Sequence, residues 1–151
     1  MIQGVIVKKL VRHPDDRGYF MEVLRDDDEL LSRFGQASFS KTYPGVIKAF
    51  HYHELQDDLW FFPSGNAQVV LHDLRADSQT KGETNVFYMG EDNPQLLVIP
   101  IGVAHGYRVL GNEPAVIMYF TTMSYDPKNP DEKRIAWDDP GIGFDWTTNN
   151  R

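Results

Sequence analysis

Cysteine is absent from the 151 residues of the sequence. The chain therefore has no disulfide and no thiolate chemistry, and its composition gives no sign of a redox compartment. Long hydrophobic runs are absent as well, since no apolar stretch approaches membrane-spanning length and the opening MIQGVIVKKLVRH lacks a signal-peptide layout. We expect a cytoplasmic protein that does not enter a membrane.

Positive charge is in short supply. The sequence has 15 Lys and Arg residues against 22 Asp and Glu residues, which gives a formal net charge of −7. A surface of this sign argues against a nucleic-acid partner. A single nucleotide is still possible, because a few placed Arg or Lys side chains bind a diphosphate whatever the total charge. A chain of this length is expected to form one domain, residues 1–151.

Helical signals are few. The strongest begins with three aspartates at 26–28 and ends at Gly35, so we expect one short helix over residues 28–34. Elsewhere, short β-branched or aromatic runs alternate with turn residues, which is typical of an all-β sandwich or jelly roll. We expect strands over residues 2–11, 19–24, 37–43, 45–53, 58–62, 67–74, 84–89, 95–99, 106–110 and 115–121.

The segment from residue 126 onward is rich in Pro, Asp and Asn. We expect it to be ordered coil that lies over the barrel, with Trp137 and Trp146 as its packing anchors. The first strand, residues 2–11, is expected at an edge that a monomer would leave unpaired.

Two histidines, His51 and His53, lie two residues apart in an expected strand, so both side chains should point to one face. Asp58 begins the next apolar run, and His105 lies in a turn signal, PIGVAHGY, between two later runs. Three imidazoles and a carboxylate in one pocket form either a metal site or an acid–base site. The residues alone leave both possibilities open.

These residues also resemble known motifs. The spacing Gly45-x5-His51-x-His53-x4-Asp58-x6-Gly65 resembles the first cupin motif, with Asp58 where glutamate is usual, and PIGVAH resembles the core of the second. Over most of the chain, the sequence is similar to the dTDP-4-dehydrorhamnose 3,5-epimerase family, as a short and divergent member. The runs that carry this resemblance are DRGYFME at 16–22, GVIKAFHY at 45–52, IPIGVAHGY at 99–107 and IAWDDPGIGFDW at 135–146.

The resemblance implies a cupin double-stranded β-helix, a homodimer, and epimerisation of a nucleotide-linked 4-keto-6-deoxy sugar in polysaccharide precursor synthesis. It implies that His51 removes a proton next to the ketone, that Tyr119 returns one from the opposite face, and that His105 assists the enolate oxygen. Arg17 and Lys48 would hold the diphosphate. The residues that the resemblance assigns to substrate binding are Arg17, Phe20, Glu22, Gln36, Lys48 and Tyr125.

Four departures from the family pattern affect this interpretation. Asp58 stands where the family has a lysine, Val69 where it has an aspartate, and Lys48 where it has an arginine. The family's carboxylate partner of the catalytic histidine lies beyond the second tryptophan, where this sequence reads TTNNR. Asp58 is the nearest replacement that the sequence offers.

Two mechanisms therefore compete. In the first, Asp58 is the carboxylate partner of His51 or His53 and no cofactor is needed. In the second, His51, His53, Asp58 and His105 bind a divalent metal that polarises the keto oxygen of a sugar or keto acid, which would make the lost lysine unnecessary. A non-catalytic sugar-binding cupin is a third possibility, against which the retention of both His51 and Tyr119 counts.

Overall fold

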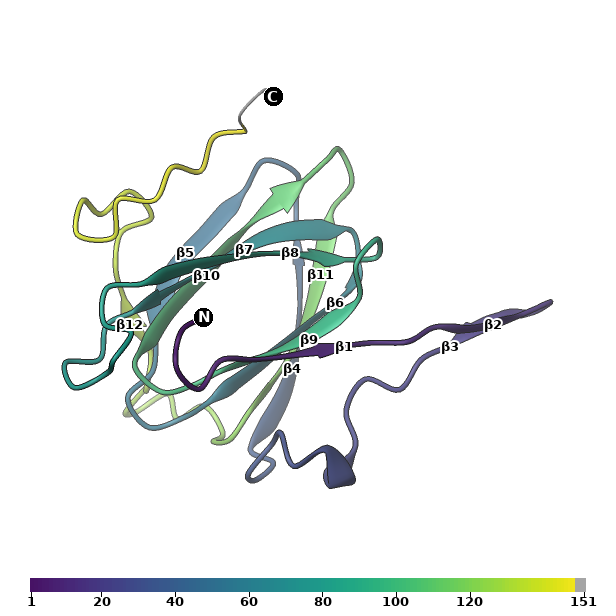
Figure 1. Ribbon diagram of the computed structural model, residues 1–151, viewed down its shortest axis with the longest axis horizontal. Coiled ribbons are helices and arrows are strands. Elements are labelled where there is room, and N and C mark those ends of the chain that lie inside the picture. The colour runs from purple at the N-terminus through teal and green to yellow at the C-terminus, as the bar shows by residue number, and fades with distance from the viewer. Residues whose placement is uncertain (149–151) are drawn as a thin grey trace.

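The computed structural model describes residues 1–148 as two five-stranded antiparallel sheets that face each other (Figure 1). The first sheet has the order β1 (Ile6–Lys9), β9 (Gln95–Ile99), β6 (Asp58–Ser64), β11 (Ala115–Thr121) and β4 (Gln36–Thr42). The second has the order β12 (Lys133–Arg134), β5 (Ile47–Tyr52), β10 (Val103–Leu110), β7 (Asn66–Asp73) and β8 (Thr84–Gly90). The all-β prediction is confirmed.

The apolar run of β6 shows why this chain forms a layered structure. Successive side chains of a strand point to opposite faces. Trp60 and Phe62 accordingly belong to the core between the two sheets, whereas Leu59 and Phe61 belong to a second cluster on the outer face of the first sheet. Both faces of β6 are buried, so its sequence is continuously apolar and does not alternate with polar residues.

Each outer face is covered by an irregular segment. Residues 21–31 supply apolar side chains over the first sheet, and residues 135–146 cover the second, where the ring of Phe50 lies 5.5 Å from that of Trp146. Trp146 is 5% exposed and is the anchor that the sequence predicts. Trp137 is 52% exposed, so its prediction as a packing anchor is wrong; its contribution is the backbone carbonyl that accepts the Trp146 indole N–H at 2.9 Å. The end of this tail, residues 149–151, lies outside the described residues.

The predicted helix over residues 28–34 is wrong. One short 3-10 turn, η1 (Asp26–Asp28), takes its place, and Glu29 ends it in the left-handed conformation with φ of 55°. Leu30 and Leu31 then both pack against the outer cluster of the first sheet, which two consecutive residues of a helix could not do equally. Among the described residues, no helix is long and apolar enough to cross a membrane.

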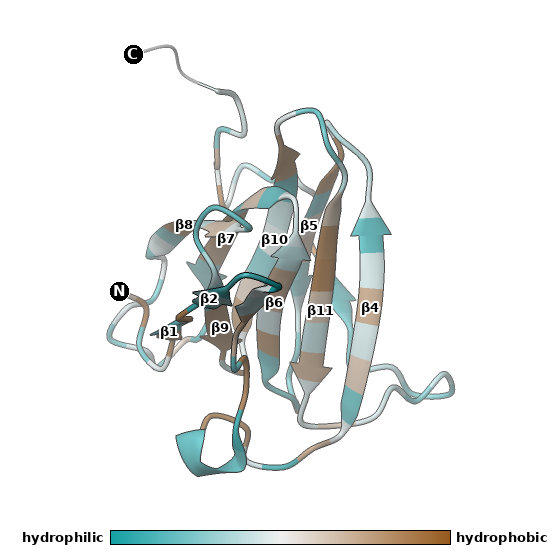
Figure 2. Ribbon diagram, turned by 90° about the vertical axis from the view of Figure 1, so that its right-hand side faces the viewer, coloured by the Kyte–Doolittle hydropathy of each residue, from teal (hydrophilic) through white to brown (hydrophobic). Residues whose placement is uncertain are grey.

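A two-stranded hairpin, β2 (His13–Asp15) and β3 (Gly18–Phe20), projects away from the sheets (Figure 1). The strand predicted over residues 19–24 ends early, at Phe20, because the residues that follow leave the hairpin and pack on the outer face of the first sheet. β1 and β4 form the two edges of the first sheet, which confirms the edge position expected for the N-terminal strand. Figure 2 shows the contrast within this sheet: β11 is largely hydrophobic, whereas the edge strand β4 alternates.

Candidate active site

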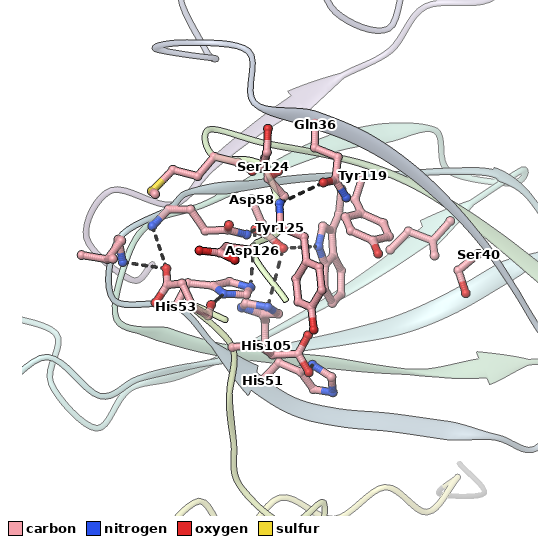
Figure 3. A pocket seen from close by; sticks show the side chains of 18 of the residues that line it. Gln36, Ser40, His51, His53, Asp58, His105, Tyr119, Ser124, Tyr125 and Asp126 are labelled. Carbon is pink, nitrogen blue, oxygen red and sulfur yellow. Dashed lines mark hydrogen bonds and ion pairs between the residues drawn. The ribbon is translucent and has the colours of Figure 1, made fainter. Parts of the chain in front are cut away.

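A pocket of about 700 Å³ lies between the two sheets, and both sheets contribute side chains to it (Figure 3). This volume suits a ligand larger than a simple sugar. Eight of the residues predicted for the site line the pocket: Gln36, Lys48, His51, His53, Asp58, His105, Tyr119 and Tyr125.

Three predicted substrate-binding residues, Arg17, Phe20 and Glu22, do not line this pocket. Arg17 lies in the turn of the projecting hairpin, where its side chain is 83% exposed and pairs with Asp15 at 2.5 Å. Phe20 ends the hairpin and is 65% exposed.

Strand register places two of the histidines opposite each other. His105 of β10 is the cross-strand partner of His51 of β5, and the pairing shifts by a bulge between His105 and Tyr107. Gly106 at the bulge has no room for a side chain, because an added Cβ would lie 2.3 Å from the Ala49 Cβ. His105 therefore lies inside a strand and not in the predicted turn, since β10 begins earlier than expected.

His51 has a carboxylate partner that the sequence interpretation missed. Its Nδ1 lies 3.4 Å from Glu132 Oε1, because β12 pairs with β5 and sets Arg134 opposite His51. The Arg134 guanidinium donates to the same carboxylate oxygen at 2.9 and 2.7 Å. Of the two histidines predicted as partners of Asp58, His51 pairs instead with Glu132.

The charges around this pair favour a neutral imidazole beside a carboxylate anion. Burial lowers the pKa of His51 below its usual range, although Glu132 opposes that effect. Burial alone would raise the pKa of Glu132, but the hydrogen bond from Arg134 and the neighbouring His51 lower it overall. A neutral imidazole can accept a proton, and the adjacent anion stabilises the imidazolium that results.

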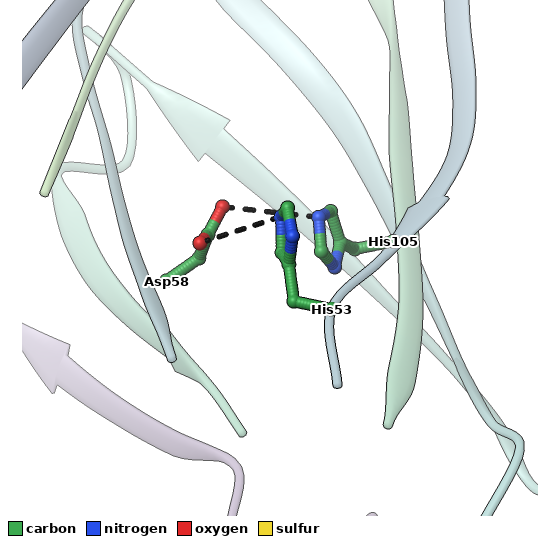
Figure 4. Close-up of side chains that lie close together, drawn as sticks. All are labelled: His53, Asp58 and His105. Carbon is green, nitrogen blue, oxygen red and sulfur yellow. Dashed lines mark ion pairs between the residues drawn. The ribbon is translucent and has the colours of Figure 1, made fainter. Parts of the chain in front are cut away.

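The other two histidines converge on Asp58 (Figure 4). His53 Nε2 lies 3.6 Å from Asp58 Oδ1, and His105 Nε2 lies 3.8 Å from Asp58 Oδ2. Trp60 Nε1 donates to Asp58 Oδ2 at 3.2 Å, and Gln56 donates to Oδ1 at 2.9 Å. The second predicted partner of Asp58, His53, does lie beside it.

Burial and proximity shift the protonation of this cluster. Burial raises the pKa of Asp58, but the neighbouring imidazoles of His53 and His105 outweigh it and lower the pKa overall. Burial lowers the pKa of His53, yet Asp58 and the Asp131 carbonyl raise it overall. Burial also lowers the pKa of His105 to about 4, so this imidazole is neutral.

The potential metal ligands are fewer than the four predicted. Within residues 1–148, the ligand atoms that come together are those of His53, Asp58 and His105, all within 4.8 Å of one another. His51 belongs instead to the pair with Glu132. The two imidazoles of the His-x-His motif therefore face different carboxylates in the same pocket: His51 faces Glu132, and His53 faces Asp58.

Tyr119 belongs to the first sheet, whereas His51 belongs to the second, so the two approach the pocket from opposite walls (Figure 3). On β11, Tyr119 is the cross-strand partner of Trp60. Gln36 lines the pocket and also makes a structural hydrogen bond. Its side-chain oxygen accepts the backbone N–H of Tyr125 at 2.9 Å. That bond ties the segment after β11 to β4.

Asp131 is a second residue that the sequence interpretation missed. Its carboxylate accepts the backbone N–H groups of Glu54, Leu55 and Gln56 at 2.9, 2.8 and 3.1 Å, and its carbonyl oxygen contacts His53 Nδ1. Residues 131–134 thus hold the loop before Asp58 and also orient both histidines of the first motif. The sequence signal that could have indicated these residues is the charged run DEKR at 131–134, which directly precedes the family-like run at 135–146.

The family model for dTDP-4-dehydrorhamnose 3,5-epimerase matches residues 1–151. The chain belongs to this family. It is 73% identical over 151 residues to the spore coat polysaccharide biosynthesis protein SpsL of Bacillus subtilis, with all of both chains covered. Its structure is similar to the crystal structure of a dTDP sugar isomerase from Desulfovibrio desulfuricans, with a TM-score of 0.90, 31% identity, and 99% and 94% of the two chains covered.

A second similar structure is the dTDP-6-deoxy-D-glucose-3,5-epimerase of Legionella pneumophila in complex with dTDP-4-keto-L-rhamnose. It has a TM-score of 0.85 and 29% identity, and the match covers 97% of this chain and 80% of that one. The predicted family, the cupin jelly roll and the prediction of an enzyme, a sugar-nucleotide epimerase, are thereby confirmed. The alternative of a non-catalytic sugar-binding protein is not supported. Cytoplasmic location stays a prediction.

Proposed function

We propose that this pocket epimerises a dTDP-linked 4-keto-6-deoxy sugar at one or both carbons next to the ketone. The observation that carries the proposal is the placement of His51 and Tyr119 on opposite sheets, facing one pocket. Inversion at carbon requires that a proton leave one face and return to the other. The bound dTDP-4-keto-L-rhamnose of the Legionella relative supports the class of substrate.

The steps balance without an external reactant. His51 accepts the proton from the carbon next to the ketone, and the electron pair of that C–H bond moves to form the enolate. Tyr119 then donates its hydroxyl proton to the opposite face of the same carbon, and the enolate electrons restore the ketone. Exchange with solvent returns the proton to Tyr119 and removes it from His51.

The diphosphate of the substrate requires cations in a protein whose net charge is −7. Lys48 and Arg134 both line the pocket. The Lys48 ammonium donates to Ser40 Oγ at 3.1 Å, and the Arg134 side chain is 77% exposed, so both can reach a ligand. Arg134 thereby joins Lys48 and Arg17 as a proposed diphosphate ligand.

The test is direct turnover of dTDP-4-keto-6-deoxy-D-glucose, followed by chromatography and NMR of the product. Conversion to a sugar inverted at carbon 3, carbon 5 or both is the expected result. The same sugar linked to GDP serves as the control for the nucleotide. The proposal would be overturned if the purified, folded protein failed to convert the dTDP-linked sugar.

Glu132→Gln is expected to lower kcat by about 10²-fold with little change in KM, because the amide cannot stabilise the imidazolium of His51. The loss should be smaller than that at a buried triad carboxylate, since the Glu132 side chain is 30% exposed. Steady-state kinetics provide the measurement. Glu132→Asp should recover part of the rate.

Two controls separate this role from a general structural one. Glu113→Gln changes the same functional group in an exposed turn and should leave kcat unchanged. In the His51→Ala background, Glu132→Gln should cause little further loss, because Glu132 acts through His51. A full additional loss in that background would contradict the proposed role.

We also propose that the chain is a homodimer in which the β2–β3 hairpin completes the partner's pocket. The exposed aromatic residues Tyr19 and Phe20 on the hairpin, together with Phe39 and Tyr43 near the β4 edge, are 52–69% exposed. Side chains of this kind, next to an unpaired strand edge, favour association. A dimer of this form would give Arg17, Phe20 and Glu22 their predicted contact with substrate.

Subunit mixing tests the dimer. His51→Ala and Arg17→Ala homodimers should each be impaired, whereas mixing them should restore about a quarter of the wild-type activity. Half of the randomly exchanged dimers are mixed, and one of their two sites carries neither substitution. No recovery after proven subunit exchange, or sedimentation of the active wild type as a monomer, would refute the shared site.

A further inference from the structure

His53, Asp58 and His105 form a convergent set of buried polar groups in the pocket (Figure 4). Their side chains are 11%, 5% and 3% exposed. An ionised carboxylate at this depth is costly unless a cation lies beside it. The Lys and Arg side chains of the lining, Lys48 and Arg134, contact Ser40 and Glu132 instead.

The outer nitrogen of each imidazole is held by a backbone carbonyl. His105 Nδ1 lies 3.0 Å from the Val103 oxygen, and His53 Nδ1 contacts the Asp131 oxygen. A carbonyl can only accept, so each Nδ1 carries a hydrogen and donates it. In the neutral ring, the Nε2 lone pair then points toward Asp58, at 3.6 Å for His53 and 3.8 Å for His105.

Two lone pairs and a carboxylate facing one another repel unless a cation lies among them. This arrangement, in which each imidazole donates its distal N–H to a carbonyl and directs the other nitrogen inward, is that of histidines that ligate metal. The inner donor set is two imidazoles and one carboxylate, which suits divalent zinc, iron or manganese.

We infer that His53, Asp58 and His105 bind one divalent transition-metal ion, with an open coordination position that faces the pocket. Ligand atoms of a tetrahedral site are about 3.4 Å apart when each metal–ligand bond is about 2.1 Å. His53 Nε2 lies 3.6 Å from Asp58 Oδ1 and His105 Nε2 lies 3.8 Å from Asp58 Oδ2. The ligand atoms of all three residues lie within 4.8 Å of one another, so side-chain rotations that draw them together complete the site.

The chemical role of the site rests on the proposed function. A cation held here shares the pocket with His51 and Tyr119, and a divalent ion with an open position binds and polarises a keto oxygen. It would supply the positive charge that the family's lysine carries and that Asp58, which stands in the place of this lysine, cannot supply. In the competing arrangement, a proton takes the place of the metal: a protonated His53 pairs with Asp58 and no metal binds.

Metal binding can be measured independently of activity. The full-length protein is stripped with a chelator, dialysed, and titrated with Mn²⁺ alone, with bound ion followed by electron paramagnetic resonance. Zn²⁺ is then added as competitor, and metal content is measured after gel filtration. We expect one ion per chain, displacement of Mn²⁺ by Zn²⁺, and a higher Tm in the loaded protein.

Two variants and one control locate the ion. Asp58→Asn and His105→Gln should each weaken Mn²⁺ binding by at least about tenfold, with circular dichroism to confirm the fold. His72→Gln removes a histidine of β7 that does not line the pocket and should leave binding unchanged. Binding below one ion per ten chains in the wild type, or binding unaltered in both folded variants, would overturn the inference in favour of the protonated pair.

Failure of this inference and failure of the proposed function give different results. Full epimerisation by protein shown to be free of metal would reject the metal site and leave the epimerase intact. Stoichiometric metal binding without turnover of the sugar nucleotide would reject the epimerase and leave the site.

Discussion

His51→Ala is expected to lower kcat by about 10²–10⁴-fold, the usual contribution of a positioned acid or base. His51 combines a neutral imidazole, an adjacent carboxylate and contact with the cavity. Its side chain is 35% exposed, against 11% for His53 and 3% for His105, so it is the most accessible of the three histidines in the lining. Without it, no proton leaves the carbon next to the ketone, so solvent exchange should stop together with product formation. Loss of both signals distinguishes removal of the base from loss of a later step.

The measurement is incorporation of deuterium from heavy water next to the ketone, followed by NMR. His72→Gln provides a control at a histidine of β7 that does not line the pocket. Thermal unfolding of the variant checks that the fold persists, since His51 is partly exposed and supports little of the core. Exchange at the wild-type rate in folded His51→Ala would show that another group is the base.

Tyr119→Phe is expected to separate exchange from inversion. The ring keeps its place beside Trp60 in the register of β11 and β6, and only the hydroxyl is lost. His51 can still remove the proton and return deuterium to the same face, so substrate should become labelled while inverted product falls by about 10²-fold or more. The ratio of labelled substrate to product, measured by NMR, is the observable.

Tyr88→Phe is a matched control, because Tyr88 is 54% exposed on β8 and lies outside the lining of the pocket. It should leave both exchange and inversion unchanged. An unaltered yield of inverted product from Tyr119→Phe would assign Tyr119 to the packing of the sheet and require another acid.

The fold could be predicted because its information is local. Hydrophobic periodicity and turn residues place the strands from β4 to β11 within three residues of their observed ends, whereas the short strands β2 and β12 were not predicted. The helix prediction failed for a non-local reason. Leu30 and Leu31 gain more from covering the outer face of the first sheet than the acidic turn gains from continuing.

The site could be predicted only where its residues follow the motif. His51, His53, Asp58, His105 and Tyr119 all reach one pocket, as expected. Their pairing could not be foreseen, because it depends on β12 adding to β5. That strand brings Glu132 and the Asp131 carbonyl, about 80 residues later in the chain, against the two histidines.

The most direct test of the central claim is NMR of dTDP-4-keto-6-deoxy-D-glucose incubated with the wild-type protein in heavy water. We expect deuterium to enter at carbon 3, carbon 5 or both, and the labelled carbon to appear with inverted configuration in the product. Recovery of unlabelled substrate, from folded protein loaded with Mn²⁺ or Zn²⁺ as well as from protein without metal, would contradict it.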